Sequence, residues 1–249
     1  KPVFAVYSSF LQRAYDMMIH DVSLSKLNVV IAVDRAGIVG RDGETHQGVF
    51  DVAYLCSVPH MAVFCPANYA ELHDMLSLAL YRVDGPVAVR YPRGGEGEYT
   101  QSAGAAPSTI LREGKEITLV AYGVMINNVL KAAEILENWG IDAEVIKLNL
   151  INPLDTETVI RSLKKTGRVL TAEDVCAFGN VGSRLLAACA VSGLALKSVK
   201  TLDLGDGIVP QGSVNELQKQ KGLDAESIAN SAKDLFESHS DELSEENAI

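Results

Sequence analysis

The chain has 249 residues, of which 47% are hydrophobic and 22% are charged, which is the balance of a globular protein. Its formal net charge of −10 disfavours nucleic acid as a partner, because an acidic surface repels the phosphate backbone. No apolar run approaches the roughly 18 residues that a membrane span requires, so we expect no membrane partner. The length is sufficient for one large domain or for two ordinary ones.

Short apolar runs alternate with amphipathic segments over the first 90 residues. This alternation is typical of a parallel sheet whose strands are covered by helices. The predicted strands span Val3 to Tyr7, Val29 to Val33, Met61 to Phe64 and Val87 to Arg90. The predicted helices span Phe10 to Ser25, Asp51 to Cys56 and Tyr69 to Tyr81.

A segment from Gly94 to Ser108 interrupts this pattern with four glycines and a proline, which is typical of a linker. The alternation then restarts. The predicted strands are Ile117 to Tyr122, Glu144 to Leu148, Arg168 to Ala172 and Lys197 to Leu202. The predicted helices are Val124 to Trp139, Asp155 to Lys164, Val181 to Val191, Val214 to Gln220 and Ala225 to Phe236.

The pattern as a whole predicts an α/β protein made of two doubly wound, mainly parallel-sheet units. The first unit spans residues 1–104 and the second spans residues 115–237, with residues 105–114 forming the end of the linker. Residues 238–249 hold four carboxylates and are predicted to form an acidic flexible tail.

The loop from Asp34 to Gly48 is the most informative part of the chain. It follows the second predicted strand and contains four glycines, two arginines, three carboxylates and one histidine. Such residues cannot build a core. Polar loops at the carboxyl ends of parallel strands are where α/β proteins keep their ligand-binding groups.

Arg35 and Arg93 each follow a predicted strand, so both lie at the same edge of the predicted sheet. Two guanidinium groups that converge would make a phosphate clamp. The alternative is a pair of surface salt bridges with neighbours such as Asp34 or Glu96, and spacing alone slightly favours that alternative.

Asp42 and His46 lie four residues apart in the same loop. Histidine is the side chain best suited to proton transfer near neutral pH, and a carboxylate beside it would raise its basicity. The alternative is a solvated loop whose imidazole has no chemical role. Tyr7, Phe10 and Arg13 lie where the first strand meets its helix; an aromatic residue there either stacks on a flat ligand or fills the core.

Three sequence blocks carry a resemblance to a known family. The first reads D-R-A-G-x-V-G-x-D-G-x-T-H-Q-G from Asp34; the others run from Tyr7 to Asp16 and from Val89 to Gly94. Together they resemble the 1-deoxy-D-xylulose 5-phosphate synthases, which are thiamine-diphosphate-dependent transferases of the transketolase group. Weaker similarity continues to about Phe236. The resemblance implies a partial pyrimidine-binding domain followed by a transketolase C-terminal-like domain.

The resemblance also implies roles for the residues above. Arg35 and Arg93 correspond to arginines that hold the phosphate of the acceptor aldehyde, with Tyr7 beside them. His46 and Asp42 correspond to catalytic residues that line the substrate channel. Phe10 corresponds to the aromatic that stacks on the cofactor, with Tyr7 and Arg13 as further cofactor-binding residues.

The implied reaction joins pyruvate to glyceraldehyde 3-phosphate with loss of carbon dioxide, using thiamine diphosphate and Mg²⁺. The family places its metal ligands and cofactor-activating glutamate in an amino-terminal half that this sequence lacks, so we expect no metal ligand here. The late Gly205-Asp206-Gly207 is interpreted as a structural turn. We therefore expect an inactive carboxyl-terminal fragment of a homodimeric enzyme, in the cytoplasm rather than a plastid stroma.

Two alternatives stay open. The chain could be a transketolase-like or pyruvate-dehydrogenase-type β subunit, although the specific loop sequence argues against that. It could also be a catalytically silent dimerisation module.

The chain has four cysteines, and none has the spacing of a zinc site. Cys56, Cys65, Cys176 and Cys189 are therefore predicted to be free thiols.

Overall fold

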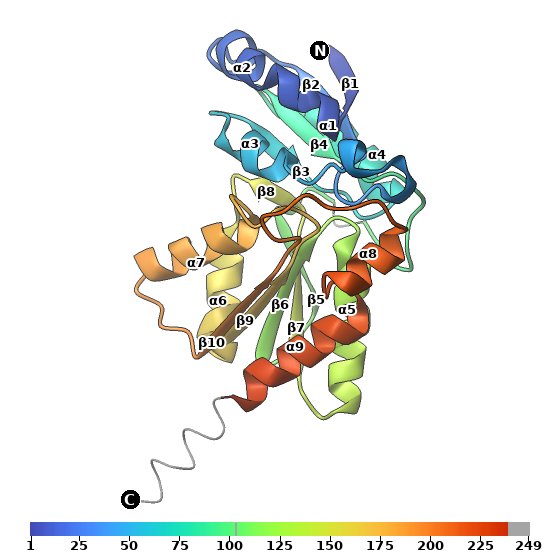
Figure 1. The fold of residues 1–249 in the computed structure, drawn as a ribbon. Coiled ribbons are helices and arrows are strands. Elements are labelled where there is room, and N and C mark those ends of the chain that lie inside the picture. The colour runs from blue at the N-terminus through green and yellow to red at the C-terminus, as the bar shows by residue number, and fades with distance from the viewer. Residues whose placement is uncertain (103, 239–249) are drawn as a thin grey trace, which may run out of the picture.

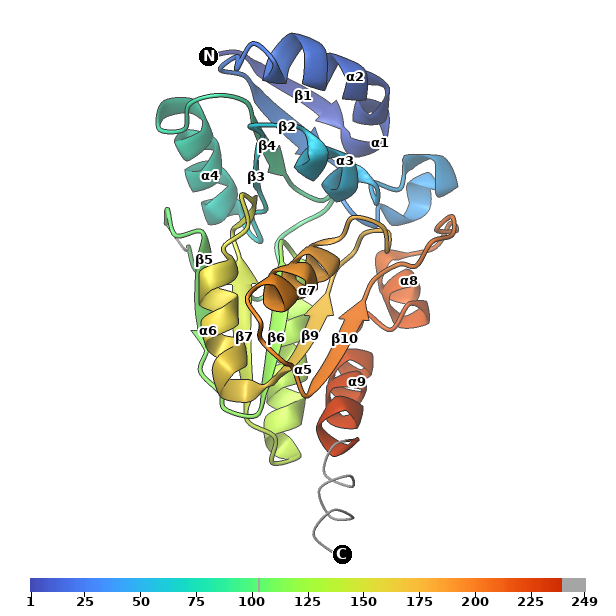
Figure 2. The ribbon, with the colours of Figure 1, turned by 90° about the vertical axis from the view of Figure 1, so that its left-hand side faces the viewer.

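The computed structural model describes residues 1–102 and 104–238, and it forms two stacked α/β units (Figures 1 and 2). The first sheet has the strand order β1-β2-β4-β3-β8. Its members are β1 (Val3–Tyr7), β2 (Val30–Asp34), β4 (Val87–Arg90), β3 (Ala62–Phe64) and β8 (Leu150–Asn152). The first four strands are parallel and β8 is antiparallel to β3.

The second sheet has the order β10-β9-β6-β7-β5. Its members are β10 (Ser198–Leu202), β9 (Arg168–Ala172), β6 (Ile117–Tyr122), β7 (Ala143–Leu148) and β5 (Ser108–Arg112). Only β5 is antiparallel to its neighbour. Two doubly wound, mainly parallel sheets are therefore confirmed.

Helices cover both faces of the second sheet, with α5 and α9 on one face and α6 and α7 on the other (Figure 1). The helices of this unit are α5 (Met125–Asn138), α6 (Thr156–Thr166), α7 (Val181–Val191), α8 (Val214–Gln220) and α9 (Ala225–Glu237). Those of the first unit are α3 (Asp51–Ser57) and α4 (Tyr69–Tyr81). The Asn68 side chain caps α4 by accepting the Glu71 amide hydrogen at 2.9 Å.

The segment predicted as one helix from Phe10 to Ser25 is instead a series of short helical turns. These are α1 (Ser8–Leu11), a 3₁₀ turn (Gln12–Ala14), α2 (Tyr15–Met17) and a π-helical turn (Met18–Ser23). The prediction of one regular helix was wrong, because an apolar period near 3.6 detects helical winding but not local changes in its pitch.

Two antiparallel edge strands were not predicted. Strand β5 lies inside the residues assigned to the linker, and that assignment is corrected accordingly. Strand β8 belongs to the second unit in sequence but completes the first sheet by pairing with β3. The predicted tail lies outside the described residues from position 239 onward.

The boundary between the units is packed and carries buried ion pairs. One apolar cluster combines residues of both units, for example Val63 with Ile146. In addition, Lys147 of β7 pairs with Glu71 of α4 at 2.9 Å, and both side chains are buried. Because the units share a sheet, a core and buried charges, they form one body. Within residues 1–102 and 104–238, no helix is long and apolar enough to cross a membrane.

Candidate active site

The candidate site lies where three parallel strands of the first sheet end. Strands β1, β2 and β4 are adjacent, and their carboxyl ends lead into Tyr7, Arg35 and Arg93 respectively. Residues that are 28 and 58 positions apart from Arg35 are thereby brought to one sheet edge. The predicted convergence of these side chains follows from this strand order.

Both arginines bind the same carboxylate. Arg35 donates to one oxygen of Asp42, and Nη1 of Arg93 lies 2.5 Å from the other oxygen. The salt bridges of the alternative interpretation are thus present, but with Asp42 as the carboxylate rather than Asp34 or Glu96. Asp34 accepts from the backbone amide of Arg35, and Glu96 accepts from the amide of Tyr69. The two guanidinium groups therefore converge on one anion, as a phosphate clamp requires.

Arg35 is held by a second contact, with Tyr7. Its guanidinium carbon lies 4.1 Å from the centre of the Tyr7 ring, and Nη2 donates to the phenolic oxygen at 3.0 Å. Its backbone adopts the left-handed conformation at φ = 58°, which non-glycine residues seldom adopt and which often marks a functional site. Its Nε atom is buried and has no hydrogen-bond partner among the described residues.

Phe10 forms an aromatic platform that is open to solvent. Its side chain is 43% exposed, so it does not fill the core. The Tyr7 ring stacks on it at a centroid distance of 5.4 Å and an interplanar angle of 25°. The His46 ring meets it edge-on, also at 5.4 Å. An exposed, preformed stack of this kind fits a flat heteroaromatic ring such as an aminopyrimidine.

Asp42 and His46 do not form the predicted pair. The Nδ1 atom of His46 lies 2.8 Å from the Thr45 hydroxyl, whereas the Asp42 carboxylate forms ion pairs with Arg35 and Arg93. Charge-assisted bonds to two guanidinium groups are stronger than one bond to an imidazole, which accounts for this preference. The His46 ring nevertheless lies against the aromatic platform, because it contacts the Phe10 ring edge-on.

Arg13 does not join this cluster. It lies exposed on the 3₁₀ turn after α1, and among the described residues no interaction links it to Tyr7 or Phe10. Two nearby hydroxyl groups, of Ser8 and Ser9, are buried without a hydrogen-bond partner in the part of the chain that the structure describes. The described ranges also contain no group of three or more histidine, cysteine or carboxylate side chains able to hold a metal ion.

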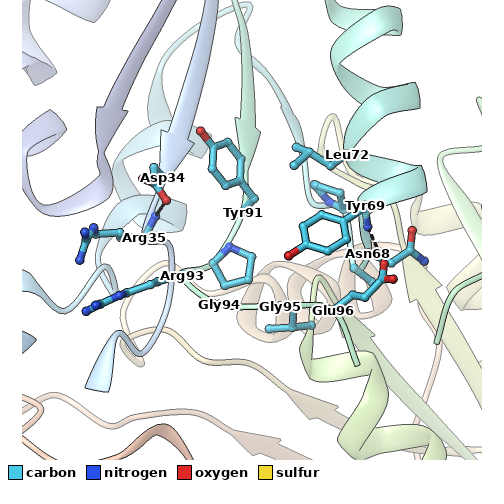
Figure 3. Close-up of a pocket in the computed structure, with 14 residues that line it drawn as sticks. Asp34, Arg35, Asn68, Tyr69, Leu72, Tyr91, Arg93, Gly94, Gly95 and Glu96 are labelled. Atoms are coloured by element: carbon cyan, nitrogen blue, oxygen red, sulfur yellow. Dashed lines mark hydrogen bonds between the residues drawn. The ribbon is translucent and has the colours of Figure 1, made fainter. Parts of the chain in front are cut away.

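A cavity of about 300 Å³ opens beside the two arginines. Figure 3 shows Arg35 and Arg93 at one end of it and Tyr69 and Leu72 at the other. Its remaining walls come from the segments after β3 and β4 and from Val124 of the second unit. Sequence patterns gave no signal for Tyr69 or Leu72, because both occur in a regular helix.

The fold and these site features define a class of protein. The model of the transketolase pyrimidine-binding domain matches residues 1–95, and that of the transketolase C-terminal domain matches residues 107–228. The chain belongs to the transketolase family. Its most similar relatives include two 1-deoxy-D-xylulose-5-phosphate synthases.

These two relatives come from bacteria. The synthase of Chlorobaculum tepidum is 42% identical over 241 residues, which covers 95% of this chain and 38% of the relative. The synthase of Caldanaerobacter subterraneus is 45% identical over 233 residues, covering 92% of this chain and 37% of the relative. The chain thus spans little more than a third of the length of these curated relatives.

Solved structures give the same fold. A split-gene transketolase described as an inactive beta4 tetramer superposes with a TM-score of 0.85 at 29% identity, over 94% of this chain and 76% of that one. A transketolase from Pichia stipitis superposes with a TM-score of 0.77 at 20% identity, covering 94% of this chain and 34% of the other. The second likeness bears on the fold alone.

Proposed function

We propose that this chain is the acceptor-binding part of a 1-deoxy-D-xylulose 5-phosphate synthase. The parent enzyme joins pyruvate to glyceraldehyde 3-phosphate with loss of carbon dioxide. The observation that carries the proposal is the convergence of Arg35 and Arg93 on one anionic group, next to the exposed Phe10 platform. The similarity to synthases of this name supports it.

The two arginines bind the phosphate of the acceptor. Asp42 shows that the gap between the guanidinium groups admits an oxyanion, because its two oxygens each bind one of them. A phosphate offers more acceptor oxygens and more charge than a carboxylate, so it competes for the same donors. Tyr7 keeps Arg35 oriented through the hydroxyl contact at 3.0 Å.

Phe10 and Tyr7 provide the stacking surface for the cofactor, and His46 lies at its edge. Thiamine diphosphate, when bound, supplies the electron sink that decarboxylation requires. His46 then gives a proton to the carbonyl oxygen of the acceptor as the new carbon–carbon bond forms. Arg13 approaches the cofactor only if a partner segment turns it inward, since it is exposed here.

The parts that this chain does not supply come from the rest of the parent enzyme. These are the Mg²⁺ ligands and the glutamate that activates the cofactor. The parent acts in the cytoplasm as a homodimer, and the second unit mediates its self-association. Phe178 and Ile208, which are 72% and 68% exposed, provide apolar surface for that contact. Sedimentation of the full chain at micromolar concentration tests this point, and a strict monomer would contradict it.

A second candidate is a subunit of a split transketolase, and the 29% identical structural neighbour favours it. The identity of the donor substrate distinguishes the two candidate functions. The chain is co-expressed with the part of the Caldanaerobacter synthase that has no counterpart in this chain, and the mixture is assayed with thiamine diphosphate and Mg²⁺. We expect product from pyruvate with glyceraldehyde 3-phosphate, and none from the chain alone.

Two outcomes would contradict the proposal. Use of a ketose phosphate donor in place of pyruvate would show transketolase activity rather than synthase activity. Turnover of pyruvate by the purified chain alone would show that it is a complete catalyst rather than one part of a site.

A further inference from the structure

The loop that carries Asp42 and His46 is docked on the second unit. After β10, the segment 208–213 runs across to this loop before entering α8 (Figure 1). Ile38 and Val49, at the two ends of the loop, are buried in the apolar cluster of the second unit, together with Val209. The site loop therefore rests on residues about 160 positions later in the sequence.

Gln47 is the buried polar link in this contact, beside an exposed bond from Gln211 Nε2 to the Arg41 carbonyl at 3.3 Å. Its side chain is buried, and both ends of its amide are used. Oε1 accepts the hydrogen of the Val39 backbone amide at 2.9 Å, and Nε2 donates to the Pro210 carbonyl at 3.0 Å. One side chain thus closes the loop on itself and ties it to the second unit. Backbone groups that are shielded from water need such partners, so loss of either bond should weaken the contact.

Close backbone packing supports the same contact. Gly37 and Gly48 form an isolated antiparallel bridge that closes the neck of the loop. Gly40 has φ = 71°, and a Cβ atom there would lie 3.1 Å from the carbonyl oxygen of Gly212. The loop and the segment 208–213 therefore approach each other so closely that a side chain at Gly40 would require one of them to shift by a few tenths of an ångström.

We infer that Gln47 is a positioning residue through which the second unit sets the location of His46. His46 is its direct neighbour in sequence. Among the described residues, the His46 ring contacts Thr45 and Phe10, which both precede Gln47, so its place depends on the backbone that Gln47 fixes. This inference rests on the proposed function for its catalytic consequence, but the tether itself is a property of the chain alone. It gives the second unit a role in the site besides self-association.

The variant Gln47→Glu tests the tether. A carboxylate keeps the acceptor for the Val39 amide but cannot donate to the Pro210 carbonyl, so it removes the bond that Gln47 makes to the second unit and places a charge beside that carbonyl oxygen. Gln220→Glu, at an exposed position at the end of α8, is the control for the change in net charge.

The first measurement uses the 249-residue chain. We expect amide exchange within residues 37–48 to accelerate about five- to a hundredfold in Gln47→Glu, while β2 keeps its protection. The NMR signal of the His46 ring should lose the shift caused by Phe10, and the signals of His20 and His73 should not move. Unchanged exchange and an unchanged His46 signal would overturn the inference.

The second measurement uses the complete enzyme. We expect Gln47→Glu to lower kcat/KM for the acceptor aldehyde about ten- to a hundredfold, because a displacement near 1 Å has that effect on a positioned group. The KM for pyruvate should stay within twofold, and Gln220→Glu should match the wild type. An equal loss for both substrates would reduce Gln47 to a structural role. If the wild type itself lacks synthase activity, the proposed function fails while the exchange result still judges the tether.

Discussion

Arg90 donates its Nε hydrogen to both carboxylate oxygens of Asp51, at 3.0 and 2.9 Å, and both side chains are almost completely buried. The same guanidinium group lies 3.4 Å from Asp174, which belongs to the second unit. Arg90 ends β4 and directly precedes the segment that carries Arg93. The buried network thus joins the two units immediately beneath the candidate site.

Removing the cation from this network should destabilise the fold. Arg90→Met leaves Asp51 and Asp174 buried and unpaired, which costs on the order of 3–5 kcal/mol in the free energy of unfolding. Urea denaturation at pH 7.5 measures the loss. Arg112→Met, which removes a more exposed pair with Glu137, should cost no more than about 1 kcal/mol. Equal, small losses in the two variants would contradict the importance of the buried network.

The pH dependence of this group has a definite sign. Burial raises the pKa of Asp51, against the opposing influence of Arg90. The folded chain therefore binds a proton at this carboxyl more tightly than the unfolded chain does. Stability from this group is present at low pH and is lost as pH rises through the folded pKa. Because Arg90 lowers the pKa of Asp51, its removal raises that pKa further, and the variant gains more stability than the wild type as pH falls. The deficit of Arg90→Met should therefore shrink between pH 7.5 and 5.5, and a deficit that grows would contradict this prediction.

The Cys56 thiol should react slowly. Burial raises its pKa to about 11 from an ordinary 9.0, which leaves about a hundredfold less thiolate near neutral pH. We expect its reaction with an aromatic disulfide reagent to be at least that much slower in the native chain than in guanidinium. The native rate should rise about tenfold per pH unit between pH 7 and 9.5. A plateau within that range would show an ordinary thiol, and Cys56→Ser identifies the signal.

Strand ends and helix caps made much of the fold predictable. The bounds of α4, β4, β6, β9 and α7 agree with the predicted ranges, because apolar runs and capping residues such as Asn68 mark them. The convergence of Tyr7 with Arg35 and Arg93 was also predictable, since carboxyl ends of parallel strands share one edge. The membership of β8 in the first sheet was not, because three residues carry no usable period.

The partner of Asp42 shows why the finer site geometry escaped prediction. Its distance of four residues from His46 suggested a pair, but Gly43, which lies between them and has positive φ, redirects the loop. Asp42 then meets arginines from the ends of two other strands. The contact between Gln47 and Pro210 spans 163 residues and leaves no local signal in the sequence. Long-range contacts of this kind follow only from the packing of the two units.

His46→Ala should slow carboligation in the complete enzyme about a hundred- to ten-thousandfold, the usual effect of losing a positioned proton-transfer group. Folding should be nearly unchanged, because the imidazole is only partly buried. His73→Ala, on the surface of α4, is the control and should retain full turnover. Single-turnover kinetics over pH 6–9 measure the effect. Wild-type rates across that range would leave His46 without a chemical role.

The clamp formed by Arg35 and Arg93 is tested by the substrate dependence of the complete enzyme. KM and kcat are measured for pyruvate and for glyceraldehyde 3-phosphate in Arg35→Ala, Arg93→Ala and the control Arg41→Ala, an exposed arginine of the same loop. Loss of a hydrogen bond to a charged group costs about 1.5–3 kcal/mol, so kcat/KM for the phosphorylated aldehyde should fall at least about tenfold in the first two variants. The KM for pyruvate should stay within twofold, and Arg41→Ala should match the wild type. Normal dependence on glyceraldehyde 3-phosphate in both clamp variants would contradict the assignment.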